Sequence, residues 1–370
     1  MSLSKKIIKR LFLLLNFFVV LIYLLNCLAP FLHADKYWFI AILGLGFPIL
    51  FFVLIIFFVG WLIVRSGWML LSLIAILLSW QQLAVAFSWH LQQPFTLTKA
   101  AGNLRVLQWN VSSWGQLNAE IKGSNGNRPM MFAEIKKYDA DVLCFQEFLE
   151  AAKTDLFDPA TKEMKKIGYP YYYYIPGNSK LEDNETGMVI FSKYPITHTG
   201  TFDFGEDESV QQLIYTDILI NGQTIRVFTI HLQSVRFGRE EYESLNQIKH
   251  RKKDGFKDSR TIVGKLKKGY KFRSLQADIV NDFVKKSPYP VILCGDFNDV
   301  PNSYTYFTIR GNLQDAFLEK GDGIGRTFRF ISPTLRIDYI FADKKLTVNQ
   351  YHRITVPYSD HYSIMADLGF

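Results

Sequence analysis

The sequence predicts an α/β domain preceded by three transmembrane helices, and three observations lead to this prediction. The first ninety residues contain three long apolar runs without charge, whereas the remainder alternates strand-like and helix-like segments. Several predicted strands end in Asp, Asn, Glu or His, the residue types that hold metal ions and move protons. A chain of 370 residues is long enough for one large domain or two ordinary ones.

The apolar runs of the N-terminal region, residues 1–90, predict membrane spans at about 11–32, 37–64 and 68–87. Each run reaches the roughly 20 residues that a helix needs to cross a bilayer. The basic stretch KKIIKR ahead of LFLLLNFFVV also fits a cleaved signal peptide. Cleavage would leave the other two spans in place, so the protein is expected in a membrane under either interpretation.

Basic residues around the runs predict the orientation of the chain. Four of them precede the first run and Arg65 lies between the second and third, whereas the first loop, HADK, carries a single Lys. Because Lys and Arg favour the cytoplasmic side, we expect a cytoplasmic N-terminus. After three crossings the C-terminal part would lie outside the cytoplasm, on the periplasmic side of a multi-pass cell-membrane protein.

Residues 91–102 are predicted to form a linker, and residues 103–370 a soluble domain in which strands and helices alternate. An Asn221-Gly222 pair between two apolar runs indicates a hairpin. In chain order the expected elements are a strand at 104–111, a helix at 130–138, strands at 140–147 and 186–196, the hairpin strands 213–220 and 224–232, a helix at 274–286, and strands at 291–296, 336–342 and 362–368.

The segment 236–273 is unusually basic. It contains thirteen Lys or Arg and five acidic residues, a net charge of +8 that equals the formal charge of the whole chain. One interpretation is a solvated loop. The other is an insertion that binds polyanions, either the phosphates of a nucleic acid or an anionic membrane surface.

The three cysteines do not form the framework of a disulfide-stabilised protein. Cys27 lies in the first apolar run, while Cys144 and Cys294 lie in strand-like apolar runs. We expect small buried thiols at all three positions. A disulfide between Cys144 and Cys294 is the alternative if their strands are neighbours.

The stretch VILCGDFND shows how polar residues follow the strands. Side chains two positions apart face the same way in a strand, so Asp296 and Asn298 project together from its end. One such residue is more often a turn former or a satisfied buried group. The pattern recurs, however, at Asn110, Glu147, His231, Asp338, Asp360 and His361.

Buried charge without a partner is costly, so a shared centre would explain all these residues at once. Their oxygen-rich composition suits Mg²⁺, Mn²⁺ or Ca²⁺ rather than zinc.

Six short motifs occur in an order typical of the endonuclease/exonuclease/phosphatase superfamily, which has the DNase I-like fold. They are WN (109–110), QE (146–147), IHLQS (230–234), GDFND (295–299), RIDYIF (336–341) and SDH (359–361). The resemblance covers residues 103–370 but not the apolar runs, so the chain resembles a membrane-anchored bacterial member. It implies a four-layer α/β sandwich, two packed sheets flanked by helices, with the site at one end of the sheets.

The resemblance implies a divalent metal, Mg²⁺ or else Mn²⁺ or Ca²⁺. Glu147 is similar to the principal metal ligand of the superfamily. Asn110 would stand beside it, and Asp360 would contribute further.

The resemblance also implies catalytic roles. Asp296 and Asn298 resemble the pair that positions the nucleophilic water and the phosphate. His361 resembles the histidine that acts on the phosphate in the transition state, and Asp338 its orienting partner. His231 is similar to the second histidine of the DNase and sphingomyelinase branches, which disfavours abasic-site repair.

Arg273 and Gln276 are predicted to support these residues indirectly, although a helix surface would explain them equally well.

The predicted function is therefore metal-dependent phosphodiester hydrolysis at a membrane, on nucleic acid or on a phospholipid or sphingolipid head group. An inositol-phosphate or nucleotide phosphatase is an alternative. It is disfavoured because Asp299-Val300 follows GDFN where the inositol branch tends to show Tyr-Arg. A catalytically silent, membrane-tethered binding module is the alternative of another class. The expected partners are the membrane and a polyanionic substrate, and no protein partner is predicted.

Overall fold

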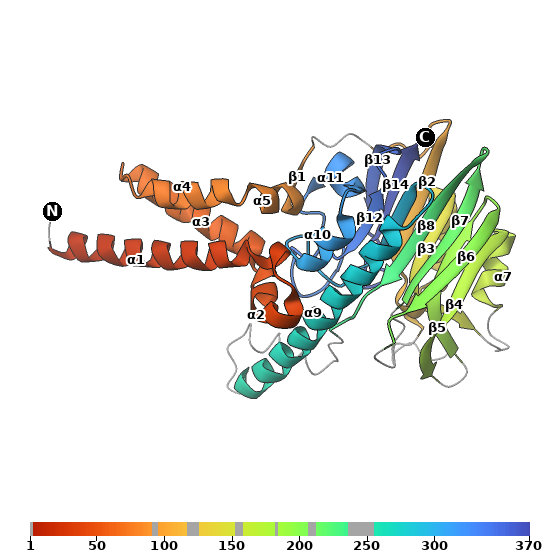
Figure 1. Ribbon diagram of the computed structural model, residues 1–370, viewed down its shortest axis with the longest axis horizontal. Coiled ribbons are helices and arrows are strands. Elements are labelled where there is room, and N and C mark those ends of the chain that lie inside the picture. Colours follow the sequence, from red (N-terminus) through yellow and green to blue (C-terminus); the bar gives the residue numbers. More distant parts are fainter. Residues whose placement is uncertain are drawn as a thin grey trace. The chain divides into compact units, whose positions relative to one another are not determined.

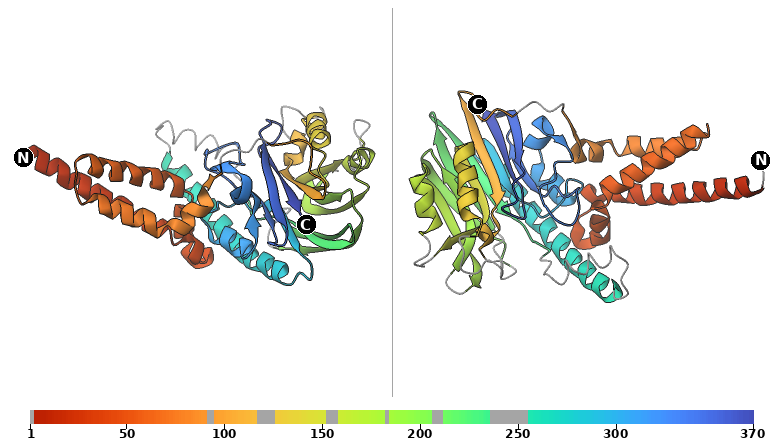
Figure 2. Two further views of the ribbon diagram at one scale, coloured as in Figure 1. Left: turned by 90° about the horizontal axis from the view of Figure 1, so that it is seen from above. Right: turned by 180° about the vertical axis from the view of Figure 1, so that it is seen from behind.

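A computed structural model describes residues 3–90, 95–116, 126–151, 158–181, 184–205, 212–235 and 255–370. Part of the predicted linker, 91–94, and much of the basic segment, 236–254, lie outside the described residues. The chain forms two compact units (Figures 1 and 2). The first comprises Met1–Phe87, Val235–Ala277 and Val300–Phe307, and the second comprises Ser88–Ser234, Asp278–Asp299 and Thr308–Phe370.

The first unit contains one helix that is long and apolar enough to cross a membrane. This span, Leu3–Phe31, consists of α1 (Leu3–Asn26) and a short 3₁₀ turn, η1 (Ala29–Phe31). Figure 1 shows α1 as a long uninterrupted helix. The first predicted span therefore corresponds to a single helix.

The other two predicted spans are each divided into two helices. A bend of 52° separates α2 (Ala34–Gly44) from α3 (Phe47–Ile63), and one of 67° separates α4 (Met69–Leu78) from α5 (Trp80–Ala86). The first break falls at Leu45-Gly46, just before a proline in the first turn of α3, where the missing N–H is tolerated. The described chain thus has one clear apolar span, or up to three if each bent pair counts as one.

The second unit is built on two mixed six-stranded sheets. The strand order of one is β10 (Gln314–Asp315), β12 (Asp338–Ala342), β9 (Val291–Asp296), β8 (Gln223–His231), β7 (Gln212–Ile220) and β6 (Ile196–Asp203). The order of the other is β13 (Thr347–Ile354), β14 (Ser363–Gly369), β2 (Asn103–Asn110), β3 (Val142–Ala151), β5 (Asn184–Ser192) and β4 (Tyr171–Leu181). A small third sheet pairs β1 (Ser88–Trp89) with β11 (Asp322–Gly323).

Each large sheet contains one parallel pair of strands, and the remaining neighbours are antiparallel. In one sheet β2 runs parallel to β3, with Asn110 opposite Gln146. In the other β8 runs parallel to β9, with His231 opposite Asp296. The carboxyl ends of parallel strands lie at the same edge of a sheet. The polar residues at the ends of each pair therefore lie side by side at that edge.

The core lies between the two sheets, where buried residues such as Val106 of β2 and Val227 of β8 belong to one apolar cluster. Cys144 of β3 and Cys294 of β9 meet in this cluster, and burial raises the pKa of the Cys294 thiol well above its usual value. All three cysteines are free, so the thiol interpretation holds and Cys144 and Cys294 form no bridge in this structure.

Helices cover the outer faces of the sheets. Met131 of α6 (Arg128–Tyr138) and Met164 of α7 (Ala160–Lys166) pack with Phe191 of β5 in a second apolar cluster, beside the 3₁₀ turn η2 (Ser112–Gly115). On the other sheet, Phe202 of β6 contacts Phe283 near the end of α9 (Gly255–Lys285), at 5.4 Å between ring centroids. The short helices α10 (Tyr304–Arg310) and α11 (Ala316–Lys320) complete the elements.

Most predicted strands of the α/β region are present, with two differences. The strand expected at 186–196 ends at Ser192, because a break containing Pro195 follows β5, and only Ile196 of the expected range belongs to the next strand, β6. The helix expected at 274–286 is the C-terminal part of the longer α9, which also includes the described part of the basic segment. The strands β1, β4, β10, β11 and β13 were not predicted.

Candidate functional site

The strand ends bring most of the predicted site residues together within the second unit. Asn110, His231 and Asp296 are the last residues of β2, β8 and β9, and Asp338 is the first residue of β12. Asp338 also lies opposite Asp296 in the antiparallel pairing of β12 with β9. His361 precedes β14. Residues from both sheets therefore reach one edge of the core.

Glu147 reaches this edge because β3 is irregular there. The register of β3 against β5 shifts between Phe145 and Phe148, and Glu147 has a φ of 49°. This bulge lets Phe145 and Phe148 both enter the same apolar cluster, with rings stacked at 6.3 Å. The Glu147 side chain in turn is 38% exposed. A bulge that re-aims one side chain is common beside active sites.

Asn110 links the carboxylates of the two sheets. Its Nδ2 donates to Glu147 Oε1 at 3.0 Å and to Asp296 Oδ2 at 3.1 Å, while its Oδ1 accepts from the N–H of Ser112 at 3.1 Å. The amide orientation is therefore fixed by three hydrogen bonds. Two carboxylates far apart in the sequence are held at a common point.

His361 is held rigidly by the fold. Its Nδ1 lies 2.9 Å from Asp338 Oδ2, and its Nε2 faces Asp296 Oδ2 at 3.7 Å. Burial lowers the pKa of His361, but the carboxylates of Asp338 and Asp296 outweigh burial and hold this pKa well above its usual value. The imidazolium form is therefore favoured at neutral pH.

His231 has a different environment. Its Nε2 lies 3.8 Å from Glu147 Oε1 and 3.7 Å from Asp296 Oδ2, too far for a hydrogen bond. Among the described residues neither ring nitrogen has a hydrogen-bond partner, although the residue is only 7% exposed. A buried imidazole with two unused nitrogens is prepared to bind a group that the protein itself does not supply.

Asp296 lies between these two histidines. Burial raises its pKa to about 6, the charge of Asp338 adds to this increase, and His361 and His231 oppose it. Its Oδ1 accepts from the N–H of Asn298 at 2.8 Å. Asn298 in turn has a φ of 52° and donates from Nδ2 to Leu232 O at 3.0 Å. The strained turn after β9 thus holds both residues in place.

The remaining predicted site residues are Asp360, Arg273 and Gln276. Asp360 is half-buried and its Oδ1 accepts from Ser359 Oγ at 3.2 Å, while its charge helps to raise the pKa of His361. Arg273 and Gln276 are buried on α9 in the part of the helix assigned to the first unit. The Arg273 guanidinium lies 4.3 Å above the Tyr270 ring. The predicted roles of these three residues stay predictions.

Three buried polar residues for which no role was predicted support the cluster from within the core. Gln108 Nε2 donates to Asp338 Oδ1 at 3.0 Å and to Gln146 Oε1 at 2.8 Å. Gln146 Nε2 then donates to Thr229 Oγ1 at 2.7 Å. One signal was present, because Gln108 lies two positions before Asn110 on the same face of its strand.

The donor set fits a hard divalent cation. Glu147, Asp296 and Asp338 form no ion pair with Lys or Arg in the described chain, only with the two histidines. Ligand atoms of Asp296, Asp338 and His361 all lie within 4.8 Å of one another. Converging carboxylates that no Lys or Arg neutralises are the environment that Mg²⁺ or Ca²⁺ prefers.

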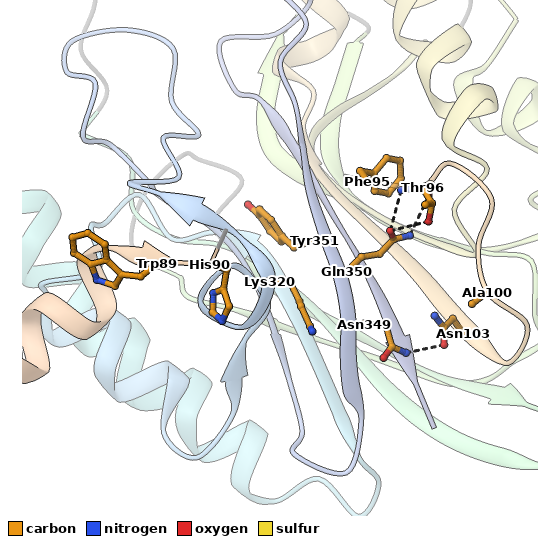
Figure 3. A pocket seen from close by; sticks show the side chains of 10 residues that line it. All are labelled: Trp89, His90, Phe95, Thr96, Ala100, Asn103, Lys320, Asn349, Gln350 and Tyr351. Atoms are coloured by element: carbon orange, nitrogen blue, oxygen red, sulfur yellow. Dashed lines mark hydrogen bonds between the residues drawn. The ribbon is translucent and has the colours of Figure 1, made fainter. Parts of the chain in front are cut away.

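A separate cavity of about 570 Å³ lies beside β13 (Figure 3). Its lining includes Trp89, Lys320 and Tyr351, and Gln350 Oε1 accepts there from the N–H and Oγ1 of Thr96. None of the lining residues belongs to the strand-end cluster. We therefore assign the candidate site to the cluster and not to this cavity.

Comparisons with known sequences give two family matches. The profile described as the Endonuclease/Exonuclease/phosphatase family matches residues 107–361, more than half of the chain. A profile described as a domain of unknown function (DUF8431) matches residues 9–86. The comparison with curated proteins gives no match.

Solved structures share the fold. An endonuclease/exonuclease/phosphatase from Beutenbergia cavernae DSM 12333 matches with a TM-score of 0.53 and 21% identity over 72% of this chain and 72% of its own. The human Nocturnin catalytic domain, with a bound sulfate anion, matches with a TM-score of 0.51 and 19% identity over 74% of this chain and 96% of its own. The α/β region, with its two mixed sheets, therefore has the DNase I-like fold that the sequence predicted.

Proposed function

The chain belongs to the endonuclease/exonuclease/phosphatase family, whose members are metal-dependent phosphoesterases, and we propose that it hydrolyses phosphodiesters at a membrane. One observation carries the proposal. Asn110 joins Glu147 to Asp296 by two hydrogen bonds, and His231 and His361 both face that pair of carboxylates. A phosphate placed there would meet a cation site, a proton acceptor and two imidazoles.

Glu147, oriented by Asn110, would hold the divalent cation, with Asp360 as a further ligand. The cation would neutralise charge on the phosphoryl oxygens, a contribution of several kcal/mol. We expect Mg²⁺, with Mn²⁺ or Ca²⁺ as alternatives, because the donors are carboxylate oxygens.

The remaining steps belong to side chains of this chain. Asp296, whose pKa of about 6 leaves it ionised at neutral pH, would take a proton from the attacking water, and Asn298 would orient that water. His361, kept protonated by Asp338, would donate from Nε2 to a phosphoryl oxygen as charge develops. Nε2 of His231, which faces the same two carboxylates, would donate to a second oxygen of the phosphate.

A lipid head group is the substrate class that we favour. The apolar span Leu3–Phe31 supports anchoring in a membrane, with the catalytic unit on the extracytoplasmic side as the basic residues predict. Within the first unit, Lys267 of α9 lies 4.9 Å above the Trp38 ring of α2, and Tyr37 and Phe39 are exposed beside it. Aromatic and basic side chains together are typical of a surface that contacts anionic lipid.

Nucleic acid is the second candidate, because the described helix α9 carries six Lys or Arg and no acid between Arg260 and Ala277. A phosphomonoesterase ranks below both. A silent binding module would need neither the Asp338–His361 pair nor the open His231, so the intact site disfavours it.

The test uses the full chain in detergent with Mg²⁺. Plasmid DNA and, separately, liposomes of sphingolipid and glycerophospholipid serve as substrates. We expect head-group release that is lost in Glu147→Ala and in EDTA. The matched control is Glu134→Ala, which removes a carboxylate on α6 and should retain activity.

Nicking of DNA without head-group release would assign the enzyme to nucleic acids. Activity undiminished by EDTA would exclude the metal mechanism. If neither substrate is hydrolysed, inositol and nucleotide esters are the substrates to test next.

A further inference from the structure

The chain between β11 and β12 contains a loop, residues 326–334, that lies against the catalytic histidine His361. Phe328 of this 326–334 loop forms an isolated antiparallel bridge with His361, and the two rings meet edge-on at 5.0 Å between centroids. The N–H of Arg329 donates to Asp360 O at 2.9 Å. All four residues belong to the second unit. The position of the loop beside His361 is therefore fixed by contacts within that unit.

The 326–334 loop has an apolar tip. Phe330 and Ile331, adjacent in the sequence, are 48% and 50% exposed. The Phe330 ring lies 6.0 Å from the Phe328 ring, so aromatic rings lead in two steps from His361 to the tip. Single exposed apolar residues are normal on a protein surface, whereas contiguous ones beside a site are typical of a binding surface.

The backbone at this tip is strained. Ile331 has a φ of 67°, and the N–H of Ser332 donates to Phe330 O at 2.8 Å, which closes a three-residue turn. A positive φ is a genuine outlier for a β-branched residue, and a turn of this hand is rare. Arg326 helps to hold it, because its Nε donates to Phe328 O at 2.7 Å. The fold thus accepts strain at two apolar residues that stay about half exposed, as functional sites often do.

Three arginines around the loop carry charge that the protein does not neutralise. Arg329 Nη1 donates to Ser359 O at 2.6 Å. Arg353 Nη1 donates to Arg326 O at 2.9 Å. None of Arg326, Arg329 and Arg353 forms an ion pair with a carboxylate of the described chain. Other arginines of the same unit do form such pairs, namely Arg105 with Asp367, Arg226 with Asp217 and Arg336 with Asp315.

We propose that the 326–334 loop docks on an anionic phospholipid bilayer, with Phe330 and Ile331 entering the apolar layer beside the catalytic site. The inference rests on the proposed function and adds the part of the catalytic unit that meets the lipid. Burial of two apolar side chains is favourable, and each basic residue near an anionic surface adds attraction. A nucleic-acid base could stack on Phe330, but the aliphatic Ile331 offers no stacking face, so the pair favours lipid.

The first experiment compares two substrates of the full chain reconstituted in phosphatidylglycerol liposomes with Mg²⁺. One is sphingolipid and glycerophospholipid in the same liposomes, and the other is bis(4-nitrophenyl) phosphate, a soluble diester. In Phe330→Ser/Ile331→Ser the loss of turnover on lipid should exceed the loss on the soluble diester by at least about tenfold. A tenfold difference needs only about 1.4 kcal/mol of lost burial.

The matched control is Leu219→Ser, which also removes an exposed apolar side chain of the second unit, one that is 39% exposed. Leu219 pairs with Thr224 near the start of β8, whereas His231 ends that strand, so the two ends lie about 25 Å apart. We expect both rates to stay within about twofold of the wild type.

Fluorescence quenching provides a readout that needs no activity. The three native cysteines are buried, so a thiol-reactive bimane should label Ile331→Cys selectively, and Leu219→Cys serves as its control. Lipids with spin-labelled acyl chains should quench bimane at position 331 but not at position 219. Replacing phosphatidylglycerol with phosphatidylcholine should reduce the quenching, because the arginines then face no net negative charge.

Equal losses on the two substrates would overturn the inference, as would equal quenching at positions 331 and 219. Nicking of DNA that is lost in Phe330→Ser/Ile331→Ser, without quenching at position 331, would assign the tip to a nucleic acid and overturn it as well. If the wild type releases no head group, the proposed function fails for lipids, and the quenching data alone decide whether the loop contacts a bilayer.

Discussion

The two histidines of the candidate site differ in what the fold has done for each of them. His361 is hydrogen-bonded to Asp338 at 2.9 Å and has a raised pKa, whereas His231 has no hydrogen-bond partner for either nitrogen among the described residues. Both face Asp296 Oδ2 at 3.7 Å. The same carboxylate thus faces two different histidines. The protein supplies a hydrogen-bond partner for His361, whereas the partner of His231 must be a bound ligand.

This difference indicates that the two histidines have separate roles in one site. A histidine paired with a buried carboxylate contributes to folding stability and to chemistry together. A histidine without partners contributes to ligand binding alone, and its burial is a cost that the ligand offsets. The predictions below test whether activity and stability separate along this line.

The largest expected effect is at Asp296, which both histidines share. Asp296→Asn keeps the shape but removes the proton acceptor, so kcat should fall toward the upper end of the range of about 10²–10⁴-fold. Stability at pH 8 should not fall, because a buried charge is removed. Turnover and urea unfolding check the two halves. Activity within tenfold of the wild type would contradict the role, and Asp282→Asn, an exposed helix variant, is the control.

The next effect is at the paired histidine. His361→Ala should lower kcat by about 10²–10³-fold. It should also destabilise the fold by about 3–5 kcal/mol, because Asp338 is left buried without its partner. In Asp338→Asn the pKa of His361 should fall, so the alkaline limb of the pH–rate profile should move to lower pH. Turnover of His361→Ala within about tenfold of the wild type would show that the assignment is wrong.

A smaller effect is expected at His231. His231→Gln removes the imidazole, so kcat should fall by about 10–10²-fold. Because Gln fills much of the same space, the free energy of unfolding should stay within about 0.5 kcal/mol of the wild type. Denaturant unfolding and steady-state kinetics on the same preparation check this separation. A loss of stability as large as that of His361→Ala would remove the contrast between the two histidines.

The smallest effect concerns the pH dependence of stability without metal. The folded pKa of Asp296 is raised to about 6, so its contribution to stability is complete below about pH 3.8 and is lost as the pH rises through 6. The raised pKa of His361 gives a contribution of the same sign, complete below about 6.5 and lost at higher pH.

In EDTA the urea concentration at half unfolding should therefore decrease as the pH rises from 4 to 6. This decrease should be smaller in Asp296→Asn. Added Mg²⁺ should reduce the fall, because a cation favours the ionised carboxylate. A midpoint that rises with pH in this window would contradict the sign.

Particular residues show how far the sequence could predict this site. Asn110, His231, Asp296 and Asp338 were predictable because each is the first or last residue of a strand with a clear apolar pattern. The support from Gln108, Gln146 and Thr229 was not. Gln108 and Gln146 lie on neighbouring strands of one sheet, and their bonds to Asp338 and Thr229 form only when the two sheets pack. Strands β4 and β13 were missed, since neither has the apolar run of a central strand.

The sequence by itself determined the kinds of element and the chemistry. Apolar runs identified the α1 span and placed most strands, and motif residues identified the family and the carboxylate and imidazole groups. These properties are local, because they depend on neighbours within a few residues along the chain.

Only the tertiary structure decided which histidine is paired and which is open. It also decided that a bulge turns Glu147 toward Asp296, and that Asn302 is held by Asn26. Such properties arise from contacts between residues that are 23 positions apart for Asp338 and His361 and 276 positions apart for Asn26 and Asn302. Hydrogen bonds depend on distances of a few tenths of an ångström, and no local pattern in a sequence fixes distances of that kind.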